Sequence, residues 1–177
     1  MASITELPAG TWTVDASHSE LGFVARHLMV TKVRGQFKEF EGTVKVGESL
    51  SDSQVTAVAQ LASIDTGSAD RDAHLKSADF FDVENNPTMS FTSTEVTADS
   101  LKGDLTIKGV TKPVVFDLEF GGLATDPWGN QKAGFEATAE INRKDWGLEW
   151  NVALEGGGVL VSEKIKINLD IQLLKAA

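Results

Sequence analysis

The sequence predicts an all-β fold, an elongated antiparallel β-barrel of about eight strands with one short helix near residues 69–78. Apolar and polar residues alternate along many segments, which is typical of strands with one buried and one wet face. Turn residues separate these segments at short intervals, and 177 residues suit a single all-β domain. We therefore expect one domain over residues 1–177, with the barrel over about residues 11–174.

The alternating segments begin with a short strand at Trp12 and Val14. Further segments follow it, each with apolar residues at every second position. Their apolar faces are Leu21, Phe23 and Ala25; Phe40, Gly42, Val44 and Val46; Val55, Ala57, Ala59 and Leu61; Met89 and Phe91; Leu101, Gly103, Leu105 and Ile107; Val114, Phe116, Leu118 and Phe120; Phe135, Ala137, Ala139 and Ile141. Turn signals at 47–53, 99–100, 108–109 and 126–130 separate many of them, which predicts an antiparallel meander.

Two segments interrupt the alternation. Residues 69–81 have an acidic first turn and stop before Asn85-Asn86-Pro87, which predicts a short helix. Residues 142–150 predict a helical turn or an irregular loop.

The last strand shows the alternation most clearly, over residues 159–173. Every second residue there is apolar except Glu163, and the residues between them are almost all polar. The apolar set is Val159, Val161, Ile165, Ile167, Leu169, Ile171 and Leu173. A strand this long favours an elongated barrel over a small sandwich.

The predicted interior contains many small residues. An eight-stranded barrel is either filled by its own side chains or holds one small ligand. Small inward residues leave a lengthwise apolar void, which stays dry until an apolar ligand fills it. The small positions are Ala25, Gly42, Ala57, Ala59, Gly103, Ala137 and Ala139. Large residues on facing strands would fill the same gaps equally well, so the pattern leaves both interpretations open.

Composition and charge exclude several classes of function. The chain has no cysteine, which excludes disulfides, thiolate metal sites and a cysteine nucleophile. Its formal net charge of −10 argues against nucleic-acid binding and against a polybasic dock on lipid headgroups. No apolar run is long enough to span a membrane, and residues 1–10 do not resemble a signal peptide. We expect a cytoplasmic protein without stable membrane insertion, either a monomer or a homodimer.

Several motifs, taken in order, resemble those of YceI-like proteins. The match runs from about Trp12 to Leu173. The motifs are Trp12-Thr-Val-Asp15-Ala-Ser-His18-Ser19 with Phe23, His27 and Val33-Arg34-Gly35-Gln36-Phe37; Ser63-Ile-Asp-Thr-Gly67; Arg71-Asp-Ala-His74-Leu-Lys-Ser-Ala-Asp-Phe-Phe-Asp82; Pro87-Thr-Met-Ser-Phe91; Gly103-Asp-Leu-Thr-Ile-Lys-Gly-Val-Thr111; and Asn142-Arg-Lys-Asp-Trp-Gly147.

The resemblance implies a lipocalin-like barrel that encloses a polyisoprenoid chain, such as a quinone-type or polyprenyl lipid. The expected role is that of a carrier or storage protein, with the lipid as ligand and no other cofactor. Many members of this family carry a signal peptide and work in the periplasm, and this chain departs from that pattern.

The inward apolar residues are the predicted tail site. Each CH₂ group of a bound prenyl chain contributes about 0.8 kcal/mol when it is buried, so no polar network is needed. The predicted lining consists of Leu21, Phe23, Val55, Met89, Phe91, Leu105, Ile107, Phe116, Phe135, Ile165, Ile167 and Leu169. Ordinary core packing is the alternative role for each of them.

Cations near a barrel mouth are the predicted headgroup site. Residues 21–38 contain Arg26, Lys32, Arg34 and Lys38 with no acidic residue among them. Arg26 and Arg34 are therefore candidates for binding a polar headgroup, and Arg71 at the start of the helix is another. The alternative is a solvated face that balances nearby acids.

The three histidines suggest no metal site. If residues 17–28 form one strand, His18 and His27 point to opposite faces. His74 follows Arg71 at a spacing that suits a surface pair. We therefore predict no metal ligands.

Serine, acid and histidine also occur close together at 63–66 and 71–74, and Asp15 lies near His18. Helix capping accounts for these acids better than catalysis does, so we predict no catalytic residue. Two alternative functions stay open: an enzyme acting on an isoprenoid or another apolar small molecule through histidine acid–base or metal chemistry, and a structural or stress-response partner with an incidental cavity. Trp128, Trp146 and Trp150 suit either closure of a barrel end or anchoring of loops.

Overall fold

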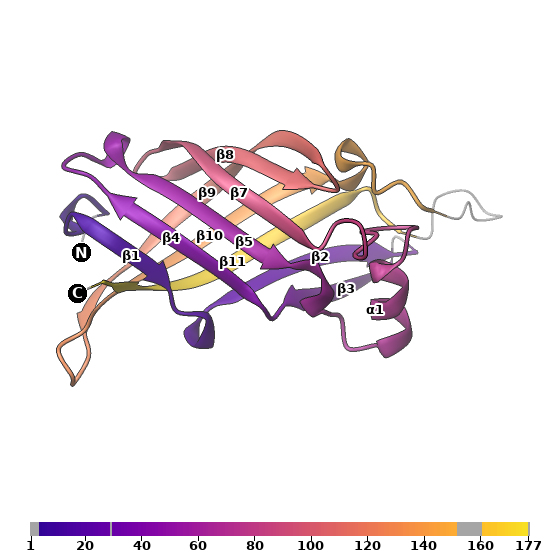
Figure 1. Ribbon diagram of the computed structural model, residues 1–177, viewed down its shortest axis with the longest axis horizontal. Helices are drawn as coiled ribbons and strands as arrows, with labels where there is room; N and C mark the ends of the chain where they lie inside the picture. The colour runs from indigo at the N-terminus through magenta and orange to yellow at the C-terminus, as the bar shows by residue number, and fades with distance from the viewer. Residues whose placement is uncertain (1–3, 29, 152–160, 177) are drawn as a thin grey trace.

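The structure is a computed structural model that describes residues 4–28, 30–151 and 161–176. Within these ranges a single sheet of eleven strands curls into a barrel (Figure 1). The strands are β1 (Gly10–Val14), β2 (Glu20–His27), β3 (Thr31–Phe37), β4 (Phe40–Val46), β5 (Gln54–Gln60), β6 (Ile64–Asp65), β7 (Thr88–Val96), β8 (Ser100–Ile107), β9 (Val110–Thr125), β10 (Gln131–Asn142) and β11 (Lys164–Lys175). The helix is α1 (Ala69–Lys76), and the short 3₁₀ helices are η1 (Ile4–Glu6), η2 (Ala16–His18), η3 (Leu50–Asp52), η4 (Leu61–Ser63) and η5 (Arg143–Trp146).

Eight strands close the barrel, as the sequence predicts. The hydrogen-bonded order is β1-β4-β5-β7-β8-β9-β10-β11, and β11 pairs back with β1. The pairings are antiparallel throughout. The predicted meander is therefore confirmed.

The three additional strands are continuations of barrel strands beyond a bend. Both β1 and β2 pair with β11, at Leu173–Lys175 and Lys166–Asp170 respectively. Likewise β3 pairs with β2 and leads into β4, which pairs with β1. The first part of the chain is therefore one long hairpin, bent at η2 on one arm and between β3 and β4 on the other.

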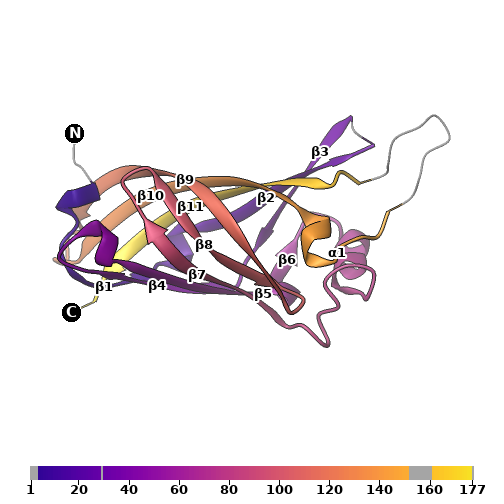
Figure 2. The same cartoon turned by 90° about the horizontal axis from the view of Figure 1, so that it is seen from above.

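The sheet splits at the end where α1 lies. There β5 pairs with β7, but β6 turns away and pairs with the last two residues of β3. Figures 1 and 2 show α1 at this end, opposite the two termini. Leu75 of α1 and the following Phe80 and Phe81 pack into the core beside the split. We call this the α1 end.

The opposite end is closed by a cluster that we call the plug, formed by Leu7, Trp12, Ala133 and Leu173. All four side chains are buried, and Trp12 is completely so. The indole Nε1–H of Trp12 donates to the carbonyl of Pro8 at 3.0 Å, which satisfies its one polar group. The N-terminal segment is thereby held across the barrel end.

Several predicted boundaries were wrong. The long last strand begins at Lys164; Val161 forms only an isolated bridge with His27, and Val159 lies outside the described residues. The helix ends at Lys76 because Ser77 becomes extended and its hydroxyl donates to the carbonyl of His74. The predicted helical turn after residue 142 is confirmed as η5.

Candidate ligand-binding site

A cavity of about 320 Å³ lies inside the barrel between the plug and the α1 end. This volume is in the range of small-molecule sites. All twelve predicted lining residues contribute to its wall. The lining residues with polar side chains are Glu41, Ser53, Ser90 and Arg143, and the rest of the wall is apolar or glycine. Contact of these residues with a ligand stays a prediction.

The small residues predicted to face inward do not all line the cavity, because Gly42, Gly103 and Ala139 are absent from its wall. Ala25, Ala57, Ala59 and Ala137 line the open cavity. Most of the space beside two glycines is instead filled by aromatic rings. A Cβ on Gly103 would lie 2.4 Å from Cζ of Phe91, and one on Gly35 would lie 2.3 Å from Cζ of Phe23.

Arg143 is a residue of this wall that the sequence did not indicate. Its side chain is buried, and Nε donates to the carbonyl of Ser162 at 2.9 Å. The other nitrogens donate to the carbonyls of Leu148 and Val161, and Phe80 presents its ring 5.9 Å from the guanidinium carbon. Burial lowers the pKa of Arg143.

The guanidinium of Arg143 therefore fastens η5 to the start of the last strand. Its named hydrogen bonds go to main-chain carbonyls, and it thereby supplies donors to the carbonyl oxygens of Ser162 and Leu148. The surrounding motif Asn142-Arg-Lys-Asp-Trp-Gly147 can be found in the sequence. The three carbonyl groups that Arg143 binds cannot be identified from the sequence.

The predicted headgroup cations lie outside the cavity wall. In β2, Leu21, Phe23 and Ala25 point inward, so Arg26 lies on the outer face. Arg34 lines the same outer groove. These two are beside the α1 end of the cavity and not within it.

Arg71, the other headgroup candidate, is held by the connection before its own helix. Its Nε donates to Thr66 Oγ1 at 2.8 Å, and another guanidinium nitrogen donates to the carbonyl of Thr66 at 2.6 Å. Asp72 accepts from the amide and hydroxyl of Thr66 at 2.9 and 2.6 Å. The pair fixes α1 to β6, which is a positioning role.

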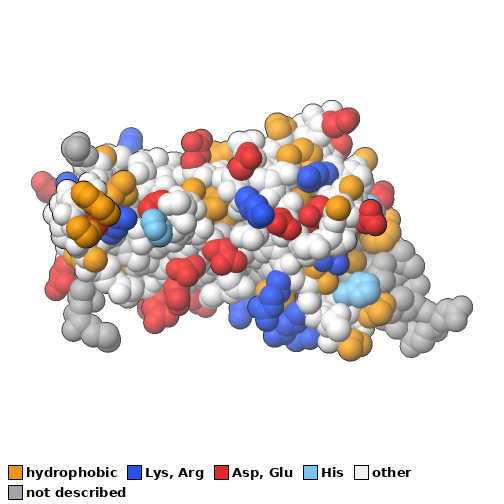
Figure 3. Space-filling model, turned by 90° about the horizontal axis from the view of Figure 1, so that it is seen from below, with side chains coloured by type: hydrophobic (Ala, Val, Ile, Leu, Met, Phe, Trp, Pro, Cys, Tyr) orange, Lys and Arg blue, Asp and Glu red, His pale blue; other side chains and the backbone are white. Residues whose placement is uncertain are grey.

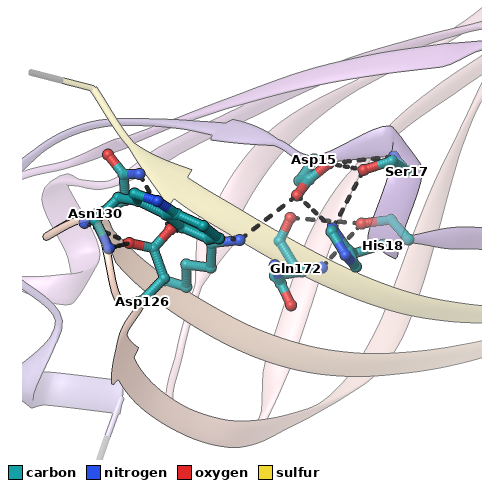
Figure 4. A network of polar contacts seen from close by, with 9 residues as sticks. Asp15, Ser17, His18, Asp126, Asn130 and Gln172 are labelled. Atoms are coloured by element: carbon teal, nitrogen blue, oxygen red, sulfur yellow. Dashed lines mark hydrogen bonds and ion pairs between the residues drawn. The ribbon is translucent and has the colours of Figure 1, made fainter.

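Asp15, Ser17 and His18 form a polar network at the closed end (Figure 4). His18 lies on η2 and not on a strand, which corrects the predicted strand over residues 17–28. Its Nδ1 contacts Asp15 Oδ2 at 2.7 Å and Ser17 Oγ at 3.2 Å. In a hydrolytic triad the serine and the acid contact different ring nitrogens, so this arrangement is not a triad.

The same network connects η2 to the β9–β10 turn. The Ser17 hydroxyl, followed by His18, lowers the pKa of Asp15. Lys132 lies 4.0 Å from Asp15 and 3.9 Å from Asp126. Asp126 accepts from the amides of Trp128 and Asn130 at 2.9 Å and so shapes the turn. The network stabilises loops.

His74 and Asp72, which lie close together in the sequence, are directed to different partners. His74 Nε2 contacts Asp79 at 2.9 Å, and its ring lies 4.5 Å from that of Trp150 and 5.2 Å from that of Phe80. In the described ranges, no three histidine, aspartate or glutamate side chains come together as a metal site. None of the helices in those ranges has the length and apolar character of a transmembrane span.

The tryptophans differ in role. Trp146 is buried, and its indole donates to the carbonyl of Leu105 at 2.9 Å, so it anchors η5 to β8. Trp150 packs on His74 at the α1 end. Trp128 is 83% exposed in the β9–β10 turn.

Curated proteins similar to this chain include a UPF0312 protein of Staphylococcus epidermidis, 42% identical over 156 residues that cover 86% of this chain and 90% of that protein. A UPF0312 protein of Staphylococcus aureus is 41% identical over 157 residues, covering 88% and 92% respectively.

Solved structures share the barrel. A Campylobacter jejuni YCEI protein superposes with a TM-score of 0.71 at 27% identity, covering 86% of this chain and 90% of that one. BcnA of Burkholderia cenocepacia gives 0.75 at 20% identity, covering 90% and 98%. A domain from Saccharophagus degradans, described as polyisoprenoid binding and implicated in plant cell wall breakdown, gives 0.73 at 16% identity, covering 93% and 98%. The YceI-like domain family itself matches residues 12–173, so the chain belongs to that family.

Proposed function

We propose that the barrel binds the tail of a long-chain isoprenoid or related amphiphilic lipid in its cavity, as a carrier or storage protein that breaks no bond. The observation that carries this proposal is the almost wholly apolar cavity of about 320 Å³ enclosed by the barrel. The polyisoprenoid binding named for the Saccharophagus degradans domain supports the same class of ligand.

Apolar burial alone supplies the driving force for such a ligand. An isoprenoid tail consists of repeated CH₂, CH and CH₃ groups, and each buried CH₂ contributes about 0.8 kcal/mol. The wall combines rigid aromatic contacts with the adaptable Met89. Phe91 and Phe116, for example, meet edge to face at 5.5 Å. A wall of this kind favours ligands that are apolar and long.

Native mass spectrometry of the freshly purified protein tests the proposal, followed by organic extraction of whatever it carries. We expect a stoichiometric adduct that extracts as a prenyl lipid. A bare polypeptide, which also takes up no prenyl-tailed quinone from detergent, would contradict the proposal.

Ala137→Phe places a ring in the cavity, because Ala137 lines it from β10. We expect affinity for the prenyl-tailed quinone to fall about 10- to 100-fold, the equivalent of the usual cost of overpacking. Val115→Phe is the matched control, since Val115 is 53% exposed on β9 and does not line the cavity. Unfolding curves show that both variants fold, and unchanged uptake by Ala137→Phe would place the ligand elsewhere.

A further inference from the structure

Positive charge collects on one part of the outer surface, although the chain carries a net charge of −10. Outward residues of β2, β3, β10 and β11 form a groove. The cations of this groove are Arg26, Lys32, Arg34, Lys164 and Lys166. Figure 3 shows basic side chains gathered on this face and acidic side chains farther toward the opposite end.

Most of these cations have no counter-ion in the part of the chain that the structure describes. Lys164 lies 3.6 Å from Glu140. Arg26, Lys32, Arg34 and Lys166 are exposed and make no ion pair with any described residue. Their charge is therefore available to a partner.

Glu140 is the acidic residue beside the lysines of the groove, 3.6 Å from Lys164 and opposite Lys166 in the β10–β11 ladder. The strands that carry Arg26, Lys32 and Arg34 contribute only Glu20 among the acidic residues of the groove. In β2, Glu20 is six residues from Arg26, about 20 Å at the usual rise of a strand. That distance is about twice the Debye length at physiological ionic strength. An anionic surface close to Arg26, Lys32 and Arg34 therefore interacts with these cations more strongly than with the distant acidic residues.

The hairpin between β2 and β3 adds an apolar tip to the same end. Val30 is 75% exposed and Leu28 is 41% exposed. Leu28 also has a φ of 55°, in the left-handed region where hairpins usually place glycine, asparagine or aspartate. Two large apolar side chains therefore project at a turn that sequence preferences would make polar.

We propose that Arg26, Leu28, Val30, Lys32, Arg34 and Lys166, the hairpin patch, dock the protein on an anionic lipid bilayer. Leu28 and Val30 enter the boundary between headgroups and acyl chains, and the cations contact lipid phosphates. Ala25 and Val161 line the cavity beside this patch, so docking brings the α1 end of the cavity to the membrane. The inference rests on the proposed function, because a lipid carrier must collect its ligand from a bilayer.

Protection of a free strand edge is the competing role for two of these cations. Of the residues in β3, Gln36 and Phe37 pair with β6, whereas Thr31–Gly35 have no second strand partner within residues 4–28, 30–151 and 161–176. Charged side chains on such an edge prevent pairing with another chain. If this were their whole role, neutral variants would aggregate without a specific loss of vesicle binding.

Co-sedimentation with vesicles of phosphatidylcholine alone, or mixed equally with phosphatidylglycerol, tests the proposal. We expect binding to the mixed vesicles only, weakened by added salt. The double variant Lys32→Gln with Lys166→Gln should bind about 25-fold more weakly, since each cation near an anionic surface contributes roughly fivefold. Lys45→Gln with Lys102→Gln, on β4 and β8, changes the net charge equally and should bind like the wild type.

Leu28→Asn tests the apolar tip, because asparagine tolerates the left-handed conformation. We expect weaker vesicle binding with an unchanged unfolding curve. Equal binding to both vesicle types, or equal loss in the two lysine double variants, would overturn the docking proposal. Ala137→Phe should lose quinone uptake and still dock, because Ala137 lines the cavity and is not part of the hairpin patch. Vesicle binding by a wild-type protein that takes up no quinone would contradict the proposed function and leave docking intact, and quinone uptake without vesicle binding would do the reverse.

Discussion

The two ends of the barrel are built differently. At the plug, β1 pairs with both β4 and β11, and Trp12 is completely buried between them. At the α1 end the sheet splits, and a helix and η5 complete the wall. The plug closes its end with strand ladders and a packed core. At the α1 end Leu75, Phe80 and Phe81 also pack into the core, but the helix and η5 are attached to the sheet by side chains that bond to the main chain.

The two ends therefore differ in how easily they open. Ladder hydrogen bonds and core packing open only when a large part of a protein unfolds, while elements held by a few side chains open locally. The hairpin patch, which includes the exposed Val30, and the Arg143 contacts both belong to the α1 end. We infer that the plug stabilises the barrel and that the α1 end is where a ligand passes.

Trp12→Ala, which removes the centre of the plug, is expected to have the largest effect and tests whether the plug stabilises the barrel. We expect the free energy of unfolding to fall by about 3 to 5 kcal/mol, because a buried tryptophan is replaced by a cavity. Urea denaturation measures it. Trp128→Ala should change stability by less than about 0.5 kcal/mol, since Trp128 is largely exposed. A similar loss in both variants would remove the distinction between a structural and a surface tryptophan.

A smaller effect is expected from Arg143→Met at the α1 end. The carbonyls of Leu148 and Ser162 lose their partner, which costs about 1 to 3 kcal/mol. Hydrogen exchange should quicken in η5 while β1 stays protected. The stability of Arg143→Lys should lie between those of the wild type and Arg143→Met. Its ammonium group keeps a donor at this place but cannot reproduce the geometry of the guanidinium. Loss of protection in β1 as well would show that the two ends unfold together.

The smallest expected effect concerns acid. Since the folded-state pKa of Asp15 lies below the ordinary 3.8, its stabilisation is present above that pH and is lost as pH falls through the folded value. Asp15→Asn should lower stability at neutral pH by less than about 1 kcal/mol and flatten the decline below pH 3.8. Urea denaturation at pH values on both sides of 3.8 would measure this, with Asp104→Asn as an exposed control. Identical slopes in both variants would exclude Asp15 as a source of acid sensitivity.

Alternation in the sequence predicted the eight barrel strands and twelve residues of the cavity wall, because the period of two fixes which side chains face inward. It could not predict the wall residues outside those strands, such as Leu75, Phe80 and Arg143. It could not show that β6 leaves β5 to pair with β3, since that pairing depends on residues far apart in the chain. The partners of Arg143 are hidden for the same reason. Residues 21–38 were visibly basic, but their position on the outer face required the register of β2 and β3.

The rings over Gly35 and Gly103 have a consequence for the diameter of the cavity. Beside Gly35 the nearest atoms are all from the Phe23 ring, so a side chain determines the width there. Beside Gly103 the Phe91 ring shares the space with the main-chain carbonyl of Thr92, 2.5 Å from where a Cβ would lie. We therefore expect a shorter residue at position 23 to widen the cavity beside Gly35. The width of the cavity can then be adjusted by point substitution while the strand scaffold is kept.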